Sequence, residues 1–384
     1  MPRTVGSKVV DLGRRMVCRL LAFMGAGFVL GCGGSGSDPP LPPPPPDPPP
    51  DPGASTVVHV HAPSATSWNG ETDFWNHVSQ PVVDRMVDEG MMALTGKPTV
   101  ADAWRAVLPS YAPGEAIAIK ANFNNAASCS YAGPEIDALM QPINAIVRGM
   151  KAIGVEESDI WVYDAIRAIP DRFVAAREFP GVRCFGARGC APEAATFDSG
   201  DADATVAFSP PAGVSKPPTT RLTDVLIGAT YLINMPILKS HGIAGVTLGF
   251  KNHFGTIQDP YGLHTYVGPG QAYSALVDIF RNPHVGAKTI LTIGDGLFGT
   301  LGGCCAAPNR WGTFGDQVPN SLFFSKDPVA IDCVMADFLA AETSIPSNAT
   351  AYLQLAAAKG LGTFERGDPW GAGYDAIDYV RREL

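Results

Sequence analysis

The stretch EAIAIKANF (residues 115–123) opens the segment that decides the fold. Its short apolar run with Ile residues is typical of a buried strand. PEIDALMQPINAIVRGMKAIG (134–154) follows with apolar residues at helical spacing, a Pro near its start and a Gly at its end. DIWVYDA (159–165) then returns to a strand pattern. A strand, a helix and a strand within about fifty residues are typical of a βαβ unit, which predicts a parallel sheet.

Strand-like and helix-like segments also alternate along the rest of the chain, without a repeat of fixed period. The expected strands are 55–62, 204–210, 230–238, 288–296 and 320–327, and the expected helices are 273–282, 327–342 and 349–362. We therefore predict an α/β fold with a mainly parallel sheet and helices on both faces. A division into two lobes around a cleft stays open as a variant of this fold.

Composition limits the class of partner. The chain has 384 residues, of which 46% are hydrophobic, enough for one large domain or two ordinary ones. Its formal net charge of -9 argues against the broad basic surface that DNA or RNA binding requires. We therefore exclude nucleic acid as a main partner, whereas a local pocket of Lys and His is compatible with this charge.

The first residues read as an export signal. Several Lys and Arg residues precede LLAFMGAGFVLG (20–31), an apolar run too short to span a membrane as a helix. We predict that residues 1–31 are a signal peptide. The residues before Cys32 resemble a bacterial lipobox, in which this Cys becomes the lipidated first residue of the mature protein. An ordinary signal peptide cut elsewhere is the alternative, and the choice between Sec and twin-arginine export stays open.

We expect residues 32–54 to consist of the lipidated Cys and a Pro-rich linker, which reads GGSGSDPPLPPPPPDPPPDPGA after the Cys. Such a composition favours extended polyproline and provides no core. We expect this linker to hold a folded α/β domain, residues 55–384, away from a membrane to which the lipid attaches it. The predicted location is therefore the bacterial cell envelope, on its periplasmic or surface face.

Cysteine usage fits an exported protein but does not fix the disulfide pairing. Six Cys residues follow Cys32, and Cys184 and Cys190 bracket a short loop that favours a disulfide between them. No CxxC motif occurs, so zinc ribbons and ferredoxin-type clusters lose their usual support.

Polar residues follow the expected strands at their carboxyl ends, where α/β sheets bind ligands. For a single strand, a polar residue that simply meets solvent is the simpler interpretation. Five strands that end in this way predict one polar cleft. The residues delivered there are Lys120, Asn122, Asp164, Lys239, His241, Asp295 and Asp327.

The segment LINMPILKSHGIAGVTLGFKNHFGTI (232–257) is the richest in such groups. His241 is the natural proton carrier near neutral pH, and Lys239 or Lys251 would hold a carboxylate or phosphate. A purely structural alternative pairs Lys239 with Asp327 and Lys251 with Asp295 as buried ion pairs, with no ligand.

The sequence TIGDGLFG contains a formal GxGxxG directly after a strand. The residues that follow are a poor helix opening, so the helix N-terminus of a dinucleotide site is missing. We expect a tight glycine loop that positions Asp295. The chain also lacks GxSxG, HExxH and Walker A motifs, which disfavours the common hydrolase and NTPase mechanisms.

Four segments in order, AIAIKANF, NMPILKSHGIAGVTLGFKNHFG, TIGDG and FFSKDPVAIDCVMADFL, resemble the domain of unknown function family 362. The resemblance covers most of residues 57–370 and supports the α/β fold and the site. Many relatives carry a cysteine-rich ferredoxin-like segment that this chain lacks, so no iron–sulfur cluster is expected here. The family brings no settled activity. The positions that fit its motifs are Lys120, Asn122, Lys239, His241, Lys251, Asn252, Asp295, Asp327 and Asp332.

We therefore expect an enzyme that acts on a small anionic or metal-bound substrate, with a divalent metal as one candidate cofactor. A non-catalytic lipoprotein that binds a ligand in the same cleft is the alternative, and the oligomeric state stays open. The expected catalytic residues are Lys239, His241, Lys251 and Asp295, and the expected ligand-binding residues are Lys120, Asn122, Asn252 and Asp327.

Overall fold

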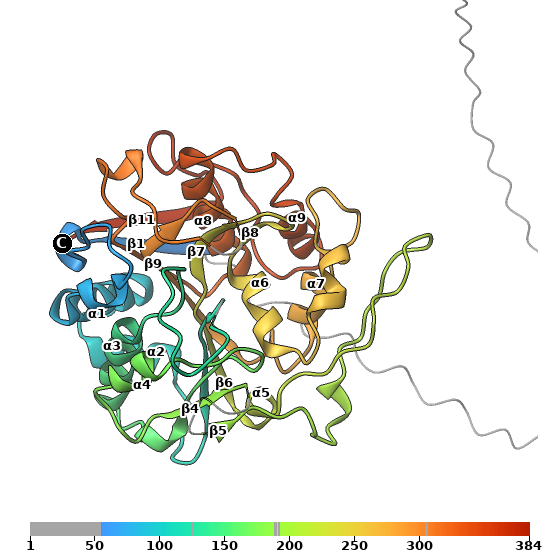
Figure 1. Ribbon diagram of the computed structural model, residues 1–384, viewed down its shortest axis with the longest axis horizontal. Coiled ribbons are helices and arrows are strands. Elements are labelled where there is room, and N and C mark those ends of the chain that lie inside the picture. The colour runs from blue at the N-terminus through green and yellow to red at the C-terminus, as the bar shows by residue number, and fades with distance from the viewer. Residues whose placement is uncertain (1–54, 125, 188–189, 191–192, 304–305) are drawn as a thin grey trace, which may run out of the picture. The chain divides into compact units, whose positions relative to one another are not determined.

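A mixed sheet forms the centre of the protein in this computed structural model, which describes residues 55–384 apart from 125, 188–189, 191–192 and 304–305 (Figure 1). The predicted signal peptide, Cys32 and linker lie outside the described residues. The strands are β1 (Ser55–His61), β2 (Ile117–Lys120), β3 (Ile160–Tyr163), β4 (Arg183–Gly186), β5 (Glu193–Ala194), β6 (Tyr231–Asn234), β7 (Ile237–His241), β8 (Gly245–Thr247), β9 (Thr289–Thr300), β10 (Ser321–Ser325) and β11 (Ile377–Glu383).

The strand order is β11-β1-β10-β9-β6-β2-β3-β4-β5, and β7 pairs with both β9 and β8. Most neighbours are parallel, including the central β6-β2-β3-β4 group. The antiparallel pairs are β1 with β10, β10 with β9, and β7 with β8. The predicted α/β fold with a mainly parallel sheet is therefore confirmed.

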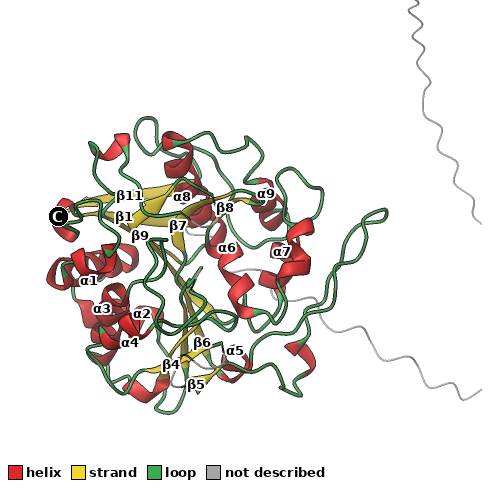
Figure 2. Cartoon of the chain, in the orientation of Figure 1, coloured by secondary structure: helices red, strands yellow, loops and turns green. Residues whose placement is uncertain are grey.

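Helices cover both faces of the sheet (Figure 2). Side chains of β2 alternate between the two cores: Ile117 and Ile119 pack with α1 to α4, and Ala118 packs with α5 to α9. Residues 55–384 lie within one compact unit, so the variant with two lobes is not observed. The helices are α1 (Gln80–Thr95), α2 (Val100–Val107), α3 (Met140–Lys151), α4 (Asp171–Ala175), α5 (Asp224–Gly228), α6 (Gly249–Asn252), α7 (Ala275–Arg281), α8 (Pro328–Glu342) and α9 (Ala351–Ala357).

Two expected strands differ from the structure. The stretch 204–210 forms no strand, and only Thr205 makes an isolated bridge, to Arg221. The stretch 230–238 divides into β6 and β7 at Met235 and Pro236. Proline has no N–H to donate to a ladder, which explains the division. β6 and β7 nevertheless both pair in parallel with β9.

The helix expected at 134–154 begins only at Met140. Before it, the backbone N–H of Ile136 donates to the carbonyl of Ala306, and that of Ala138 donates to the carbonyl of Asn122. These groups bind neighbouring loops and not the preceding turn of a helix, so tertiary contacts set the helix start.

The predicted disulfide between Cys184 and Cys190 is wrong, because neither residue is in a disulfide. Cys184 lies in β4 and is fully buried in the core, whereas Cys190 lies in the loop after it. The thiol of Cys190 instead contacts that of Cys129, and this hydrogen bond contributes most to raising the pKa of Cys190 to about 11. The sequence spacing could not reveal that the strand turns Cys184 into the core.

Among the residues that the structure describes, no helix combines the length and apolar character needed to span a bilayer.

Candidate functional site

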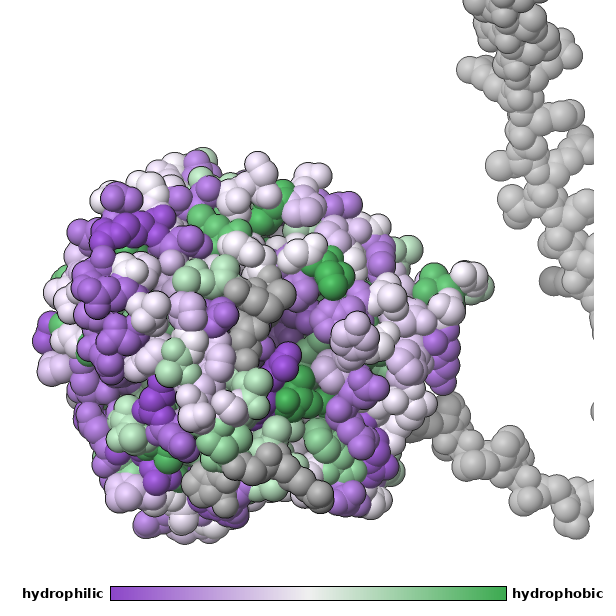
Figure 3. Space-filling model, viewed as in Figure 1, coloured by the Kyte–Doolittle hydropathy of each residue, from purple (hydrophilic) through white to green (hydrophobic). Residues whose placement is uncertain are grey.

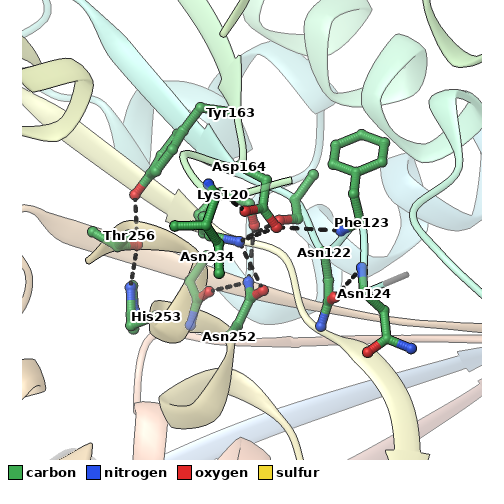
Figure 4. Close-up of polar contacts among 12 residues, drawn as sticks. Lys120, Asn122, Phe123, Asn124, Tyr163, Asp164, Asn234, Asn252, His253 and Thr256 are labelled. Carbon is green, nitrogen blue, oxygen red and sulfur yellow. Dashed lines mark hydrogen bonds and ion pairs between the residues drawn. The ribbon is translucent and has the colours of Figure 1, made fainter. Parts of the chain in front are cut away.

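Parallel pairing brings three polar side chains into register at the carboxyl ends of the central strands. Lys120 of β2 lies opposite Tyr163 of β3 and Asn234 of β6. Asp164 follows Tyr163 directly, and all of these residues lie close together in Figure 4. The predicted meeting of polar groups at this edge is therefore observed for the ends of β2 and β3, whereas Asn234 at the end of β6 was not among the predicted residues.

Lys120 is the centre of a buried network at this edge (Figure 4). It has no exposed surface, and its Nζ donates to Asp164 Oδ2 at 3.2 Å, to Asn252 Oδ1 at 3.1 Å and to the carbonyl of Ala121. Desolvation lowers the pKa of Lys120, while the Asp164 carboxylate opposes that shift. Three acceptors satisfy the three ammonium donors, so Lys120 supports the site and does not offer a hydrogen to a ligand.

Asn252 ties the short helix α6 to the sheet. Its Nδ2 donates to the carbonyl of Lys120 at 3.0 Å and to Asn234 Oδ1 at 2.8 Å. The segment after α6 approaches Lys120 so closely that residue 255 must be glycine, because a Cβ on Gly255 would lie 2.5 Å from Lys120 Nζ. The Asn252 amide therefore positions α6.

Asp332 fixes the other end of α6. Its carboxylate accepts from the N–H groups of Gly249 at 2.7 Å and Phe250 at 3.1 Å, and from the hydroxyl of Tyr352 at 3.1 Å. Burial raises the pKa of Asp332 to about 7. Held at both ends, α6 carries Lys251 in a defined place between Phe250 and Asn252.

A second group of basic side chains lies next to this network, and we name Lys239, Lys251, Arg167, His241 and His264 the basic cluster. Lys239 has no exposed surface, and its Nζ donates to Asn124 Oδ1 at 3.2 Å. Desolvation first, and the charge of Arg167 second, lower the pKa of Lys239 to about 7. Near neutral pH both protonation states of this lysine are therefore populated.

Lys251 is the most unusual member of the basic cluster. Only 6% of the residue is exposed, and no carboxylate of the described residues forms an ion pair with it. Its Nζ lies 3.5 Å from the ring centroid of Phe254 and 3.5 Å from His264 Nε2. Desolvation, then the charges of Lys239 and Arg167, hold the pKa of Lys251 well below its usual range.

The hydrogen bonds of His241 fix its tautomer. Its Nδ1 lies 3.0 Å from the backbone nitrogens of Ile243 and of Ala244, both of which donate. Nδ1 is therefore unprotonated and Nε2 carries the proton. Burial first, and then Lys251 and Lys239, lower the pKa of His241 to about 3. Near neutral pH His241 is an N–H donor, whereas the sequence suggested a general acid or base.

His264 has the opposite tautomer. Its Nδ1 lies 3.2 Å from the carbonyl of Pro260 and 3.1 Å from that of Tyr261, and carbonyls only accept. The lone pair of Nε2 therefore faces Lys251. Burial first, and Lys251 second, lower the pKa of His264. The His264 and His241 rings stack with centroids 6.0 Å apart.

Arg167, His264 and Asn124 were absent from the residues that the sequence suggested. Arg167 follows Asp164 by three positions, so the strand-end criterion could have found it on β3. Asn124 follows Asn122 by two and could have been found after β2 in the same way. His264 lies in an irregular stretch beyond α6 that no pattern marked.

Asn122 has a local role in the loop after β2. Its Oδ1 accepts from the N–H of Asn124 at 2.9 Å, and its carbonyl accepts from Ala138. The bond shapes the loop whose Asn124 contacts Lys239. Asn122 therefore acts on the basic cluster through Asn124.

Asp295 lies apart from the basic cluster. β9 continues through its glycines to Thr300, so Asp295 is inside a strand and not in a loop after one. Its Oδ1 accepts from Leu297 at 3.1 Å, and its Oδ2 has no partner among the described residues. Burial first, and the nearby Asp137 charge, raise the pKa of Asp295 to about 7.

Asp327 caps the N-terminus of α8. Its Oδ1 accepts from Val329 and Ala330, and its Oδ2 accepts from Ser55 at 2.6 Å and Thr363 at 2.8 Å. Because β10 runs antiparallel to β9, the carboxyl end of β10 lies at the opposite edge of the sheet. Asp327 is therefore not part of the site.

The ion pairs of the structural alternative do not occur. Asp327 and Asp295 accept hydrogen bonds from backbone N–H groups. In the described part of the chain, Lys251 and Asp295 do not form an ion pair. The pair observed at the site joins Lys120 and Asp164. Among the same residues, no group of three or more His, Cys, Asp or Glu side chains is arranged to hold a metal ion.

The surface is hollowed near the centre of the face shown in Figure 3, over the place that α6 occupies in Figure 1. Strongly hydrophilic residues lie in this hollow. Within the basic cluster Lys239 and Lys251 are buried, Arg167 is exposed, and His241 and His264 are partly exposed, so the cluster extends to the surface.

Comparison with known proteins identifies the family of the chain. No curated protein matches it. The family model described as Domain of unknown function (DUF362) matches residues 117–337, more than half of the chain, from the start of β2 into α8. The matched range contains the Lys120 network and the whole basic cluster. The chain therefore belongs to the DUF362 family.

Proposed function

We propose that this chain is an exported, lipid-anchored protein of the bacterial cell envelope that binds a small carboxylate or phosphate compound at the basic cluster and converts it chemically. The observation that carries this proposal is the grouping of Lys239, Arg167 and two histidines around Lys251, which has no described carboxylate partner.

Electrostatics favours an anion at this place. Burying like charges side by side is costly, because low-dielectric surroundings strengthen their repulsion. The nearest acidic group of the strand ends, Asp164, is committed to Lys120 and to backbone N–H groups. A bound anion would relieve the repulsion and raise the pKa of Lys239, which would then be held in its protonated form.

The geometry divides the work among the members of the basic cluster. The Arg167 guanidinium and protonated Lys239 supply the positive charge. His241 offers its Nε2 hydrogen to an oxygen of the ligand. Lys251 and His264, in mutual contact, are the groups able to move a proton at the reacting atom.

The cellular location in this proposal rests on residues 1–54. The apolar run 20–31, the lipobox-like residues before Cys32 and the Pro-rich linker support export, lipidation and a tether to the membrane.

The test is calorimetric titration of the full chain with sulfate and with oxamate, two anions that keep their charge across neutral pH. Wild type should bind at least one of them, and Lys239→Met should lose most of that affinity. Lys326→Met is the control for a general loss of positive charge, because Lys326 is an exposed lysine that donates to the carbonyl of Ala106 and lies outside the basic cluster. No binding by wild type, or equal loss in the control, would contradict the proposal.

A non-catalytic binding protein is the second candidate. The tautomer of His241 favours it, because Nδ1 already accepts two backbone hydrogen bonds and the ring can then donate its Nε2 hydrogen to a ligand but cannot take up a proton from it. Native mass spectrometry of protein taken from its producing cells would identify a retained anion. Recovery of that compound unchanged after long incubation favours the binding protein, whereas a product favours the enzyme.

A further inference from the structure

We propose that Lys251 is a nucleophile that forms an imine with a small carbonyl compound bearing a carboxylate or a phosphate. The inference rests on the proposed anion site and names its substrate class. It uses contacts of Lys251 that anion binding alone leaves unexplained.

The surroundings of Lys251 favour its neutral amine. Its stem and Nζ are buried, and the Nζ contacts the face of Phe254 and His264 Nε2, neither of which bears a negative charge. The charges that act on it, Lys239 and Arg167, are both positive. Desolvation beside another cation is an arrangement that turns a lysine into an amine nucleophile. A lysine that served only to attract an anion would gain nothing from losing its charge.

Different side chains around Lys251 contact the two functional groups of the substrate, the anion and the carbonyl. Arg167 and Lys239 hold the carboxylate or phosphate, and Lys251 then meets a carbonyl carbon a short distance away. The His241 Nε2 hydrogen is available to the carbonyl oxygen, because Nδ1 already accepts two backbone N–H groups. Donation to that oxygen increases the positive character of the carbonyl carbon.

His264 completes the proton balance. As the C–N bond forms, the π electrons of the carbonyl move to oxygen, and the amine proton passes to His264 Nε2. That proton is then returned to the oxygen, which gives a neutral carbinolamine. The second amine proton follows the same route through His264 Nε2 to the hydroxyl group, which leaves as water while the nitrogen lone pair forms the C=N bond. The sum is amine plus carbonyl compound giving imine plus water, with no oxidant or reductant.

Position is as important as proton affinity in this assignment. Gly249 and Phe250 are bound by Asp332, and Asn252 is bound to the sheet, so the residues on both sides of Lys251 are fixed. A nucleophile held on such a support needs little reorganisation to meet a bound carbonyl.

The test is reductive trapping on the full wild-type chain. The protein is incubated with pyruvate and sodium cyanoborohydride, digested, and mapped by mass spectrometry. We expect modification of Lys251 to exceed that of Lys326 at least roughly tenfold, because one pKa unit changes the neutral fraction tenfold. Lys326 is an internal control, because it is an exposed lysine outside the basic cluster whose pKa is lowered by desolvation.

Two matched pairs of probes test the need for an anion. Methyl pyruvate lacks the carboxylate charge of pyruvate, and pyridoxal lacks the phosphate of pyridoxal 5′-phosphate. Selective labelling of Lys251 by pyruvate but not its ester assigns a carboxylate to the substrate, and selective labelling by pyridoxal 5′-phosphate but not pyridoxal assigns a phosphate. Equal labelling of Lys251 and Lys326 by all four probes would overturn the proposal. Because wild type is mapped directly, the result does not depend on the folding of a Lys251 variant.

Oxamate separates failure of the imine from failure of the anion site, because it resembles pyruvate but its amide carbonyl forms no imine. Oxamate binding without trapping at Lys251 overturns the nucleophile and leaves the anion site intact. Absence of both overturns the proposed function together with this inference. Oxamate binding that protects Lys251 from pyruvate supports both.

Discussion

Lys239 and Lys251 owe their properties to what surrounds each ammonium group. Both are buried, and the charge of Arg167 lowers the pKa of both; it also lowers that of the equally buried Lys120, but there the Asp164 carboxylate opposes the shift. Burial and a neighbouring cation thus do not by themselves mark a functional lysine, because structural ion pairs also shift pKa values. Lys251 differs from Lys120 because no carboxylate of the described residues acts on it.

Binding of oxamate should depend on pH through Lys239. Its pKa in the folded protein is lowered to about 7, so the protonated form that attracts an anion prevails below this pH. Affinity should therefore fall as pH rises from 6 to 9, by up to about tenfold per unit above 7 if one proton is coupled. Calorimetry in buffers of equal ionic strength measures this slope. A constant affinity over that range would remove Lys239 from the site.

His241 should respond differently to two amide substitutions. The Oδ1 of Asn replaces Nδ1 as the acceptor for Ile243 and Ala244, whereas the longer Gln moves its acceptor away. His241→Asn should therefore keep most of the stability and lose only the Nε2 donor. His241→Gln should lose about 1 kcal/mol or more from the free energy of unfolding. Urea unfolding compares the two, and equal stability would show that the turn does not need the ring nitrogen.

At the scale of elements, the site is held by the carboxyl ends of β2, β3 and β6 and by α6. The ends of β2 and β3 could be predicted from sequence, because apolar runs followed by Lys120 and Asp164 identify strands that enter a parallel sheet, whereas the end of β6 at Asn234 lay inside the longer expected strand 230–238. The direction of β10 could not, since a short strand pattern is the same for either orientation. Asp327 was for this reason assigned to the wrong edge.

The pair of Lys120 and Asp164 should show strong coupling. Both side chains are buried, so Lys120→Met leaves a carboxylate without its partner and should cost about 3–5 kcal/mol of stability. Replacing both, as Lys120→Met with Asp164→Asn, should cost less than the sum of the single changes. A double-mutant cycle from urea unfolding measures this difference. Strict additivity would contradict the network role.

A disulfide between Cys129 and Cys190 should form under oxidising conditions. The thiols of Cys129 and Cys190 lie in contact, on the loops after β2 and β4, in a chain whose first residues favour export. Peptide mapping without reduction should find a disulfide between them and an unlinked Cys184. Alkylation of both thiols in unreduced protein from an oxidising compartment would refute it. The short loop from Cys184 to Cys190 had suggested another pairing, because sequence separation does not show which thiols point into the core.

At the scale of the whole molecule, the sequence predicted the α/β class and the family, and pattern alone left the composition of the site incomplete. The parallel strands and their helices follow from local periodicity. His264 joins the basic cluster from an irregular segment, and Asp295 leaves it because β9 continues through its glycines. Both outcomes depend on tertiary packing, which a local sequence pattern does not reveal.

Attachment to a membrane is a prediction about residues 1–54. The full chain expressed with its signal should partition into the detergent phase of a Triton X-114 separation and carry a lipid on Cys32. Cys32→Ser should move to the aqueous phase without a change in the fold of residues 55–384. Equal partitioning of the two forms would exclude lipidation at Cys32.

The most direct measurement of the anion site is a crystal structure of the protein grown with oxamate. The account predicts an oxamate carboxylate bound by Lys239 and Arg167, with an oxygen facing His241 Nε2, at the hollow over α6. Oxamate bound at another place, with a protein carboxylate lying among Lys239, Lys251 and Arg167, would contradict the proposed anion site.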